Sequence, residues 1–139
     1  MPDRVLYTAE ATSSGDGRNG RVATSDHRLD LDLALPPELG GSGNGTNPEQ
    51  LFAAAYAACF HGALRSLARQ AGIDVGESIV TAQVGIGPEA DMYGLEVTLI
   101  ISIPGLDQDK TRELAEAAHH WCPYSRATRG NISVELRVP

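Results

Sequence analysis

The segment from Asn47 to Gly72 constrains the fold of this chain more than any other. Asn47 suits a helix N-cap, Pro48 suits the first helical position, and Gln50 stands where a capping box places Glu or Gln. Glu49 adds negative charge at the positive end of the helix dipole. The pattern therefore predicts a long helix that begins at Pro48 and that Gly72 ends.

The first half of this helix, residues 51–60, is apolar on every side, whereas the second half carries Arg65, Arg69 and Gln70. A helix that is apolar all round is buried. The many alanines in the first half also permit close approach to another backbone. We therefore expect a central helix whose first half is buried and whose second half can meet water.

Strand signals stand on both sides of this helix. Six segments show patterns typical of strands: residues 4–12, 21–25, 28–35, 78–86, 95–103 and 131–138. A shorter helix is expected from the cap at Asp107 to about His120, with Pro123 stopping it. The order is βββ-α-ββ-α-β, with strands in hairpin-like groups. We therefore expect an α+β fold with antiparallel sheets around a central buried helix, in a single domain over residues 1–139.

The charge of the chain excludes some classes of partner. It has 18 acidic residues against 11 Lys and Arg, for a net charge of −7. Nucleic-acid binding needs a basic face and no Lys/Arg cluster is present, so no nucleic acid is expected as a partner. An acidic surface disfavours an anionic membrane, and we expect no apolar stretch long enough to span a bilayer. No basic region followed by an apolar run opens the chain, so a cytoplasmic protein is expected.

Cys59 and Cys122 are the only cysteines. In a reducing cytosol two thiols are more often redox-active or catalytic than permanently bridged, although a free cysteine is also a common buried hydrophobe. A metal site is less favoured, because Cys59 and His61 stand two positions apart on a helix and point to different faces. We therefore expect redox chemistry and no metal, and assign no role to His61, His119 or His120.

Two motifs carry a resemblance to a known family. Residues 46–64, TNPEQLFAAAYAACFHGAL, resemble the core motif of the organic hydroperoxide resistance (Ohr) proteins of the OsmC/Ohr superfamily. Residues 122–138, CPYSRATRGNISVELRV, are similar to the second-cysteine motif of that family. GDGRNGRV and LDLDLALPPELGGSGNGTNPEQ are similar to its N-terminal part. The resemblance covers nearly the whole chain, and its two cysteine motifs make it specific.

This resemblance implies a thiol peroxidase that reduces organic hydroperoxides, fatty-acid-like ones included, to alcohols. From the positions of the cysteines in the motifs, the resemblance implies that Cys59 is the peroxidatic cysteine and Cys122 the resolving one. It also implies that the two cysteines form a Cys59–Cys122 disulfide. Arg18 and Glu49 fall where the family keeps an Arg and a Glu. The resemblance further implies an intertwined homodimer, no bound cofactor, and dihydrolipoamide or a lipoylated protein as the dithiol reductant.

The chemistry of these residue types fits that reading. Burial of Cys59 in an apolar helix raises the pKa of its thiol, so a nearby cation has to offset the burial. Arg18 could supply the cation, and Glu49 could hold the guanidinium by a bidentate pair. Without the resemblance, Arg18 would be interpreted as a solvated turn residue and Glu49 as a favourable helix start.

The spacing of Glu49 and Cys59 bears on assembly. They are ten positions apart, or about 15 Å along a continuous helix, which a Glu side chain does not span. The spacing favours a two-fold dimer in which each Glu49 approaches the Cys59 of the other copy.

Two other functions fit the same features. A peroxidase of the OsmC subgroup would share the fold and both cysteines and differ in substrate range, although PEQLFAAAYAACF and CPYSRATRGN favour the Ohr subgroup. A non-catalytic redox sensor or ligand carrier would react once per reducing event. Steady-state turnover with a dithiol distinguishes that sensor from an enzyme.

Overall fold

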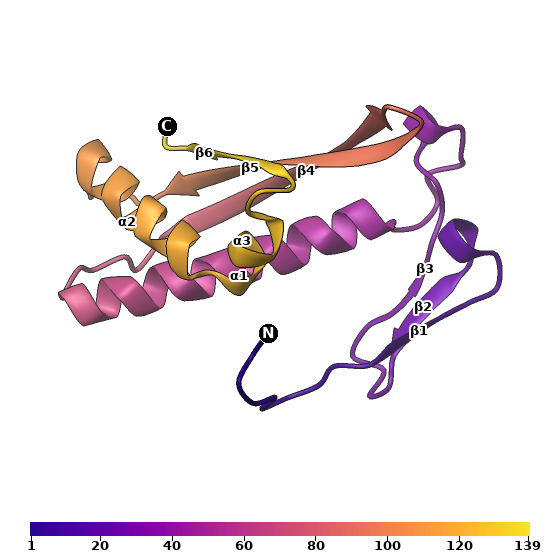
Figure 1. Cartoon of the computed structure of the whole chain (residues 1–139), viewed down its shortest axis with the longest axis horizontal. Helices are drawn as coiled ribbons and strands as arrows, with labels where there is room; N and C mark the ends of the chain where they lie inside the picture. The colour runs from indigo at the N-terminus through magenta and orange to yellow at the C-terminus, as the bar shows by residue number, and fades with distance from the viewer. The chain divides into compact units, whose positions relative to one another are not determined.

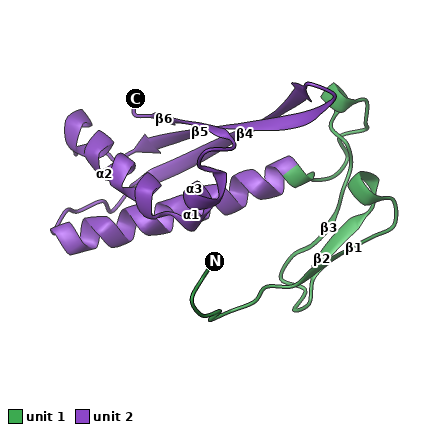
Figure 2. Ribbon diagram, in the orientation of Figure 1, with its two compact units in different colours: residues 1–48 green, residues 49–139 purple.

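The computed structural model describes residues 1–139, which form two compact units: residues 1–48 and residues 49–139 (Figure 2). Each unit contains a three-stranded sheet of its own, and the helix that the sequence places at the centre belongs almost wholly to the second (Figure 1). The α+β class is confirmed. The expectation of a single domain stays a prediction.

Unit 1 is built on an antiparallel sheet. Its strands are β1 (Ala11–Ser14), β2 (Arg21–Thr24) and β3 (Asp30–Asp32), paired in that order. A turn of 3-10 helix, η1 (Gly17–Asn19), joins β1 to β2, and a second one, η2 (Pro37–Leu39), follows β3. The strand predicted at 21–25 is therefore confirmed as β2.

Two other strand predictions in this unit were wrong in extent. Residues 4–10 of the expected strand 4–12 lie outside any strand, and β1 instead begins at Ala11. The expected strand 28–35 is reduced to β3, after which Leu33 makes a single parallel bridge to Thr46. The reason is the short middle strand: β2 has four residues, so it can pair with only a few residues on either side, whatever the alternation of the flanking sequence.

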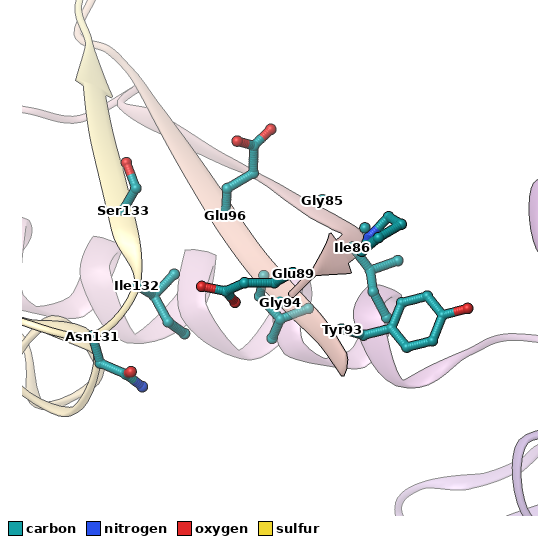
Figure 3. A pocket seen from close by; sticks show the side chains of 12 residues that line it. Gly85, Ile86, Glu89, Tyr93, Gly94, Glu96, Asn131, Ile132 and Ser133 are labelled. Atoms are coloured by element: carbon teal, nitrogen blue, oxygen red, sulfur yellow. The ribbon is translucent and has the colours of Figure 1, made fainter. Parts of the chain in front are cut away.

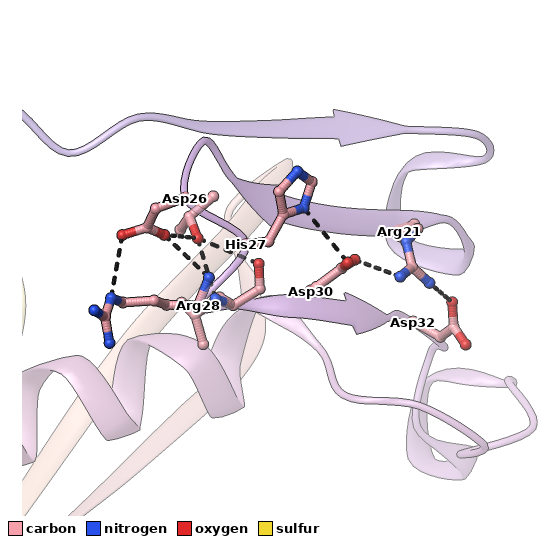
Figure 4. A network of polar contacts seen from close by, with 8 residues as sticks. Arg21, Asp26, His27, Arg28, Asp30 and Asp32 are labelled. Atoms are coloured by element: carbon pink, nitrogen blue, oxygen red, sulfur yellow. Dashed lines mark hydrogen bonds and ion pairs between the residues drawn. The ribbon is translucent and has the colours of Figure 1, made fainter.

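Charged side chains join β2 to β3 (Figure 4). Arg21 pairs with both Asp30 and Asp32, with its Nη1 2.8 Å from the Asp32 Oδ1. In the turn between the strands, the Arg28 backbone N–H donates to the Asp26 carboxylate over 3.0 Å, and this bond holds the pKa of Asp26 below its ordinary value. These ion pairs lie at the surface, so they orient the hairpin and are not part of a buried core.

Unit 2 combines a sheet with three helices (Figure 1). The sheet contains β4 (Ile79–Glu89), β5 (Met92–Ser102) and β6 (Ser133–Arg137), in that order. Between β5 and β6 the chain forms α2 (Gln108–Trp121) and α3 (Pro123–Thr128). The strands predicted at 78–86, 95–103 and 131–138 are confirmed, with shifted ends.

The pairing of β5 with β6 corrects the expectation of antiparallel sheets throughout. β4 and β5 form an antiparallel hairpin, but β6 runs parallel to β5, with Leu99 opposite Leu136. A parallel pair needs a crossover of a dozen or more residues, and the segment that carries α2 and α3 provides it. Grouping of strands along the sequence predicts hairpins but does not reveal the direction in which a strand returns after a helical crossover.

Helix α1 spans Pro48–Ala71, as its capping residues predict, and Gly72 follows it with a φ of 69°. Its buried side chains form one stripe at four-residue spacing: Tyr56, Phe60, Leu64 and Ala68. This stripe packs into a single core with apolar side chains of β5 and α2. Unit 2 is therefore organised as a long helix laid on a sheet, with α2 completing the core.

The first half of α1 is not buried on all sides within one chain, in contrast to the expectation. Ala54, Ala58 and Gly62, again at four-residue spacing, are exposed. By length and composition alone α1 is also long and apolar enough to cross a membrane, which corrects the expectation that no stretch of the chain is. Core helices that never enter a membrane meet the same two criteria, so these do not assign a membrane span.

Replacing Ile101 by Ala should lower the free energy of unfolding by about 2–5 kcal/mol, because it removes buried methyl and methylene groups and leaves a cavity. Ile101 is fully buried, whereas Ile79 on the neighbouring strand is 59% exposed. Ile79→Ala is the matched control and should cost about 0.5 kcal/mol or less. Urea denaturation followed by circular dichroism measures both, and equal losses would contradict this placement of the core.

Candidate active site

The two cysteines lie side by side in unit 2. Cys59 is on α1 and Cys122 lies between α2 and α3, with their Sγ atoms 3.6 Å apart. Both are free thiols. Cys122 is fully buried, whereas Cys59 is partly exposed. The structure thus brings together the two residues on which the sequence analysis placed the chemistry.

Pro123 explains the position of Cys122. A residue that precedes proline is pushed out of the helical region, and Cys122 has an extended backbone with φ −62° and ψ 125°. Helix α2 ends at Trp121, close to its predicted end. Pro123 then occupies the first position of α3, a helix that the sequence analysis missed because it treated this proline only as a stop. Cys122 therefore lies at a bend between two helices.

The surroundings of Cys59 within unit 2 raise the pKa of its thiol and so disfavour the thiolate. Burial raises the pKa of its thiol, the Tyr124 backbone N–H lowers it, and the neighbouring Cys122 thiol raises it again. The net direction is upward, as the sequence predicts for a thiol inside an apolar helix. A thiolate at neutral pH therefore needs a positive charge from outside this group of residues.

Cys59 opens into a pocket of about 310 Å³. One face of α1 forms most of its wall, and the end of α2 completes it. The lining residues are Cys59, Ala63, Ser66, Leu67, Gln70, Trp121 and Pro123. None of them carries a formal charge, and Trp121 is 66% exposed at the surface. The pocket is suited to an uncharged, largely apolar group that reaches the thiol.

A buried polar cluster joins the three helices beside the cysteines. The Tyr56 hydroxyl lies 2.8 Å from the Ser125 Oγ and 3.3 Å from the Thr128 Oγ1. The same Ser125 Oγ lies 2.8 Å from the His119 Nδ1. Burial and the Arg129 guanidinium lower the pKa of His119. No role was predicted for His119 from the sequence, and the Tyr-Ser pair that follows Cys-Pro was the available signal.

His61 takes part in a separate contact. Its Nε2 lies 2.9 Å from the Ser78 Oγ, and Arg65 donates to the Val75 carbonyl from the next turn of α1. Burial lowers the pKa of His61, and Arg65 lowers it further. These bonds join α1 to the segment before β4 and leave His61 without a contact to either thiol.

The two remaining predicted site residues lie elsewhere. Glu49 is in the first turn of α1, ten positions before Cys59 on the same unbroken helix. Arg18 is in η1 of unit 1, and Cys59 belongs to unit 2. Their approach to the thiol stays a prediction.

A larger hollow of about 780 Å³ lies at the turn end of the β4–β5 hairpin (Figure 3). Glu89, Glu96 and Tyr93 line it, with Asn131 and Ser133 from the segment that begins β6. It contains no cysteine or histidine, and no three His, Cys, Asp or Glu side chains in the structure are grouped to hold a metal ion. Of these two hollows, only the smaller one is lined by a cysteine.

Comparison with known proteins shows the family to which the chain belongs. The OsmC-like protein family matches residues 41–137. The organic hydroperoxide resistance protein of Xanthomonas axonopodis pv. citri is 52% identical over 139 residues, which cover 99% of this chain and 97% of that protein. An organic hydroperoxide resistance protein from Legionella pneumophila superposes with a TM-score of 0.91 at 47% identity, covering 97% of this chain and 98% of the other.

OhrB of Bacillus subtilis, also named an organic hydroperoxide resistance protein, superposes with a TM-score of 0.88 at 42% identity, covering 97% of this chain and all of that one. These matches extend over both units and both cysteine motifs. This chain belongs to the OsmC family, and within that family it groups with the organic hydroperoxide resistance proteins.

Proposed function

We propose that this chain is a thiol peroxidase that reduces organic hydroperoxides to alcohols, with Cys59 as the attacking thiol and Cys122 as its disulfide partner. The observation that carries the proposal is the pair of free thiols with sulfurs 3.6 Å apart, one of which opens into an uncharged pocket. The role of the family in organic hydroperoxide resistance supports the choice of substrate.

In the first step the Cys59 thiolate attacks the terminal oxygen of the hydroperoxide. The O–O bond breaks, Cys59 becomes a sulfenic acid, and the departing alkoxide takes a proton to become the alcohol. Cys59 is suited to this role because it is the more accessible of the two thiols and lines the pocket, whereas Cys122 is fully buried.

In the second step the Cys122 sulfur attacks the Cys59 sulfenic acid. A disulfide forms and the sulfenic oxygen leaves as water with the thiol proton. The two sulfurs need to close from 3.6 Å to about 2.05 Å, a change that side-chain rotation and a small shift of the bend at Pro123 can supply. A dithiol then reduces the disulfide by exchange and is itself oxidised to its cyclic disulfide.

The lining of the pocket supports an acyl or alkyl hydroperoxide as the substrate. Leu67 and Ala63 offer apolar surface along α1, and the Trp121 ring lies at the end of α2. The volume of about 310 Å³ is at the lower end of ligand pockets and accommodates part of a fatty chain. The same opening admits the short, flexible dithiol of dihydrolipoamide or of a lipoylated protein, which we propose as the reductant, with no cofactor bound.

Arg18 is proposed to supply the positive charge that the Cys59 thiolate needs. Burial raises the pKa of Cys59, and the Tyr124 backbone N–H lowers it too little to reverse the shift. A guanidinium stays charged at any physiological pH, and Glu49 could fix its orientation through two parallel hydrogen bonds. The resemblance of the sequence motifs to the Ohr proteins implies an Arg and a Glu at these two positions.

A homodimer is proposed from the exposed side of α1. Ala54, Ala58 and Gly62 share one exposed face, and a Cβ atom added to Gly62 would meet nothing within 4 Å. Glycine inside a helix destabilises the helix by about 1 kcal/mol relative to alanine. No contact within one chain explains why position 62 is glycine. Close packing of this face against the same face of a second copy would explain the glycine. The same packing would bring Glu49 toward Cys59 of the partner subunit. We propose that this dimer works in the cytoplasm.

The purified protein should consume a lipid hydroperoxide continuously with dihydrolipoamide. Cys59→Ser should abolish consumption, because the nucleophile is lost. Cys122→Ser should react once and then stall as a Cys59 sulfenic acid that excess peroxide oxidises further. Peroxide consumption and intact-protein mass measure these outcomes.

Glutathione and thioredoxin are the reductant controls and should support much slower turnover. Full steady-state activity in Cys59→Ser would refute the assignment of the thiol. A wild-type protein that consumes one equivalent and stops with every reductant would instead be a redox sensor.

Arg18→Ala should raise the pKa of Cys59 and slow the peroxide step at neutral pH by about tenfold for each unit of the shift. Because only the thiolate reacts, the rate of the variant should keep rising with pH beyond the point at which the wild-type rate levels off. Thiolate absorbance and stopped-flow rates against pH measure both effects. Arg28→Ala, whose side chain is 88% exposed in the same unit, is the control. An unchanged titration in Arg18→Ala would remove Arg18 from the site.

Mixing Glu49→Ala subunits with Cys59→Ser subunits should restore activity above that of either parent. If Glu49 of one copy serves Cys59 of the other, each mixed dimer contains one intact site. Placing Gly62→Leu in both parents should abolish the recovery, because the larger side chain prevents close packing of the two helices. Size-exclusion chromatography with light scattering follows the assembly. Subunits that exchange but recover nothing would contradict a shared site.

A further inference from the structure

The polar cluster beside the cysteines has one member on each of three helices. Tyr56 belongs to α1, His119 to the last turn of α2, and Ser125 to α3. Ser125 is the centre, since its Oγ lies 2.8 Å from the Tyr56 hydroxyl and 2.8 Å from the His119 Nδ1. Tyr56 and Ser125 are fully buried. Water therefore cannot replace these bonds without opening the core.

The number of protons in the cluster fixes the direction of its bonds. Thr128 donates its hydroxyl proton to the Ser125 carbonyl over 3.1 Å, so toward Tyr56 it can only accept. Tyr56 then donates to Thr128 and accepts from Ser125, which leaves the Ser125 oxygen to accept from His119. Every short contact is satisfied only when the His119 Nδ1 carries a hydrogen.

This chain of bonds reaches the segment that carries Cys122. Cys122 is bonded to both helices: its N–H donates to the Ala118 carbonyl of α2 over 2.8 Å, and its carbonyl accepts the Arg126 backbone N–H of α3 over 3.0 Å. Helix α3 has only six residues, which is too short to hold a position by itself. Ser125 fastens it to α2 through His119 and to α1 through Tyr56, which precedes Cys59 by less than one turn.

We propose that His119 is a positioning residue for the disulfide step: its Nδ1–H, through Ser125 and Tyr56, holds the bend with Cys122 against α1 at bonding distance from Cys59. This inference rests on the proposed peroxidase cycle and adds to it a residue outside the two thiols. The same bend carries the Tyr124 backbone N–H that faces the Cys59 sulfur, so its position affects the first step to a smaller degree. The lowered pKa of His119 keeps the ring neutral and compatible with its buried partners.

His119→Leu tests the proposal because it fills the space of the ring and removes the donor. Disulfide formation after a single addition of peroxide should slow by roughly fivefold to tenfold, the effect of one lost buried hydrogen bond. The initial loss of the Cys59 thiol should slow much less, and sulfinic acid at Cys59 should increase with peroxide concentration. Rapid quench with thiol alkylation and mass spectrometry separates the two steps.

His119→Asn is the rescue variant, since its side-chain amide places an N–H close to the position of Nδ1. It should restore disulfide formation to near the wild-type rate, which general damage to the fold would not predict. His120→Leu, at the exposed neighbouring position, is the matched control and should change neither step. A His119→Leu protein that closes its disulfide at the wild-type rate would overturn the proposal, as would a folded His119→Asn that fails to recover.

Diamide oxidation separates this inference from the peroxidase proposal, because it joins the two thiols without any hydroperoxide. If the wild-type protein does not turn over peroxide, the peroxidase proposal fails, while the effect of His119 on disulfide closure by diamide is still measured. Should His119→Leu not fold, Tyr56→Phe removes the hydroxyl at the other end of the chain with little change in shape. Slower closure in Tyr56→Phe supports the proposal, and closure at the wild-type rate overturns it.

Discussion

The packing of one stripe of α1 on the sheet determines where the functional groups of unit 2 can lie. Tyr56 and Phe60 face the core, and Cys59, next to Phe60, is therefore turned toward the border between the core and solvent. A rotation of the helix by one position would bury Cys59 completely or expose it completely. The intermediate position leaves Cys59 partly accessible at the pocket while Cys122 stays buried in the interior.

This position has an electrostatic cost that the rest of the protein has to offset. A thiolate needs nearby positive charge or several hydrogen-bond donors, and unit 2 offers Cys59 one backbone N–H and a neutral thiol. In the proposed cycle the Cys122 sulfur has to be close for the disulfide to form, yet the Cys122 thiol raises the pKa of Cys59 and so favours its protonated form. Proximity of the two sulfurs and activation of the first one are therefore separate requirements, and different residues have to meet them.

Local signals in the sequence were sufficient for the elements that depend on local chemistry. The start of α1 at Pro48, its end before Gly72, the cap of α2 at Asp107 and the buried face of β5 all follow from the order of neighbouring residues. The features that were missed depend on partners far along the chain. The parallel pairing of β6 depends on a crossover of about thirty residues, and the short extent of β1 depends on the length of β2. The cysteine pair was predicted by motif, but the hydroxyl of Ser125 can be recognised as a link only when Tyr56 and His119 are placed around it.

Trp121 is the only tryptophan of the chain, and it stands exposed at the mouth of the pocket that Cys59 lines. The emission of an indole ring depends on the polarity of its surroundings, and no second tryptophan contributes a background. Its neighbour in sequence is Cys122, so the ring is attached to the very bend that bears the second thiol. The tryptophan fluorescence of this protein therefore comes from one indole at this pocket, which makes it a label-free optical probe placed at the site.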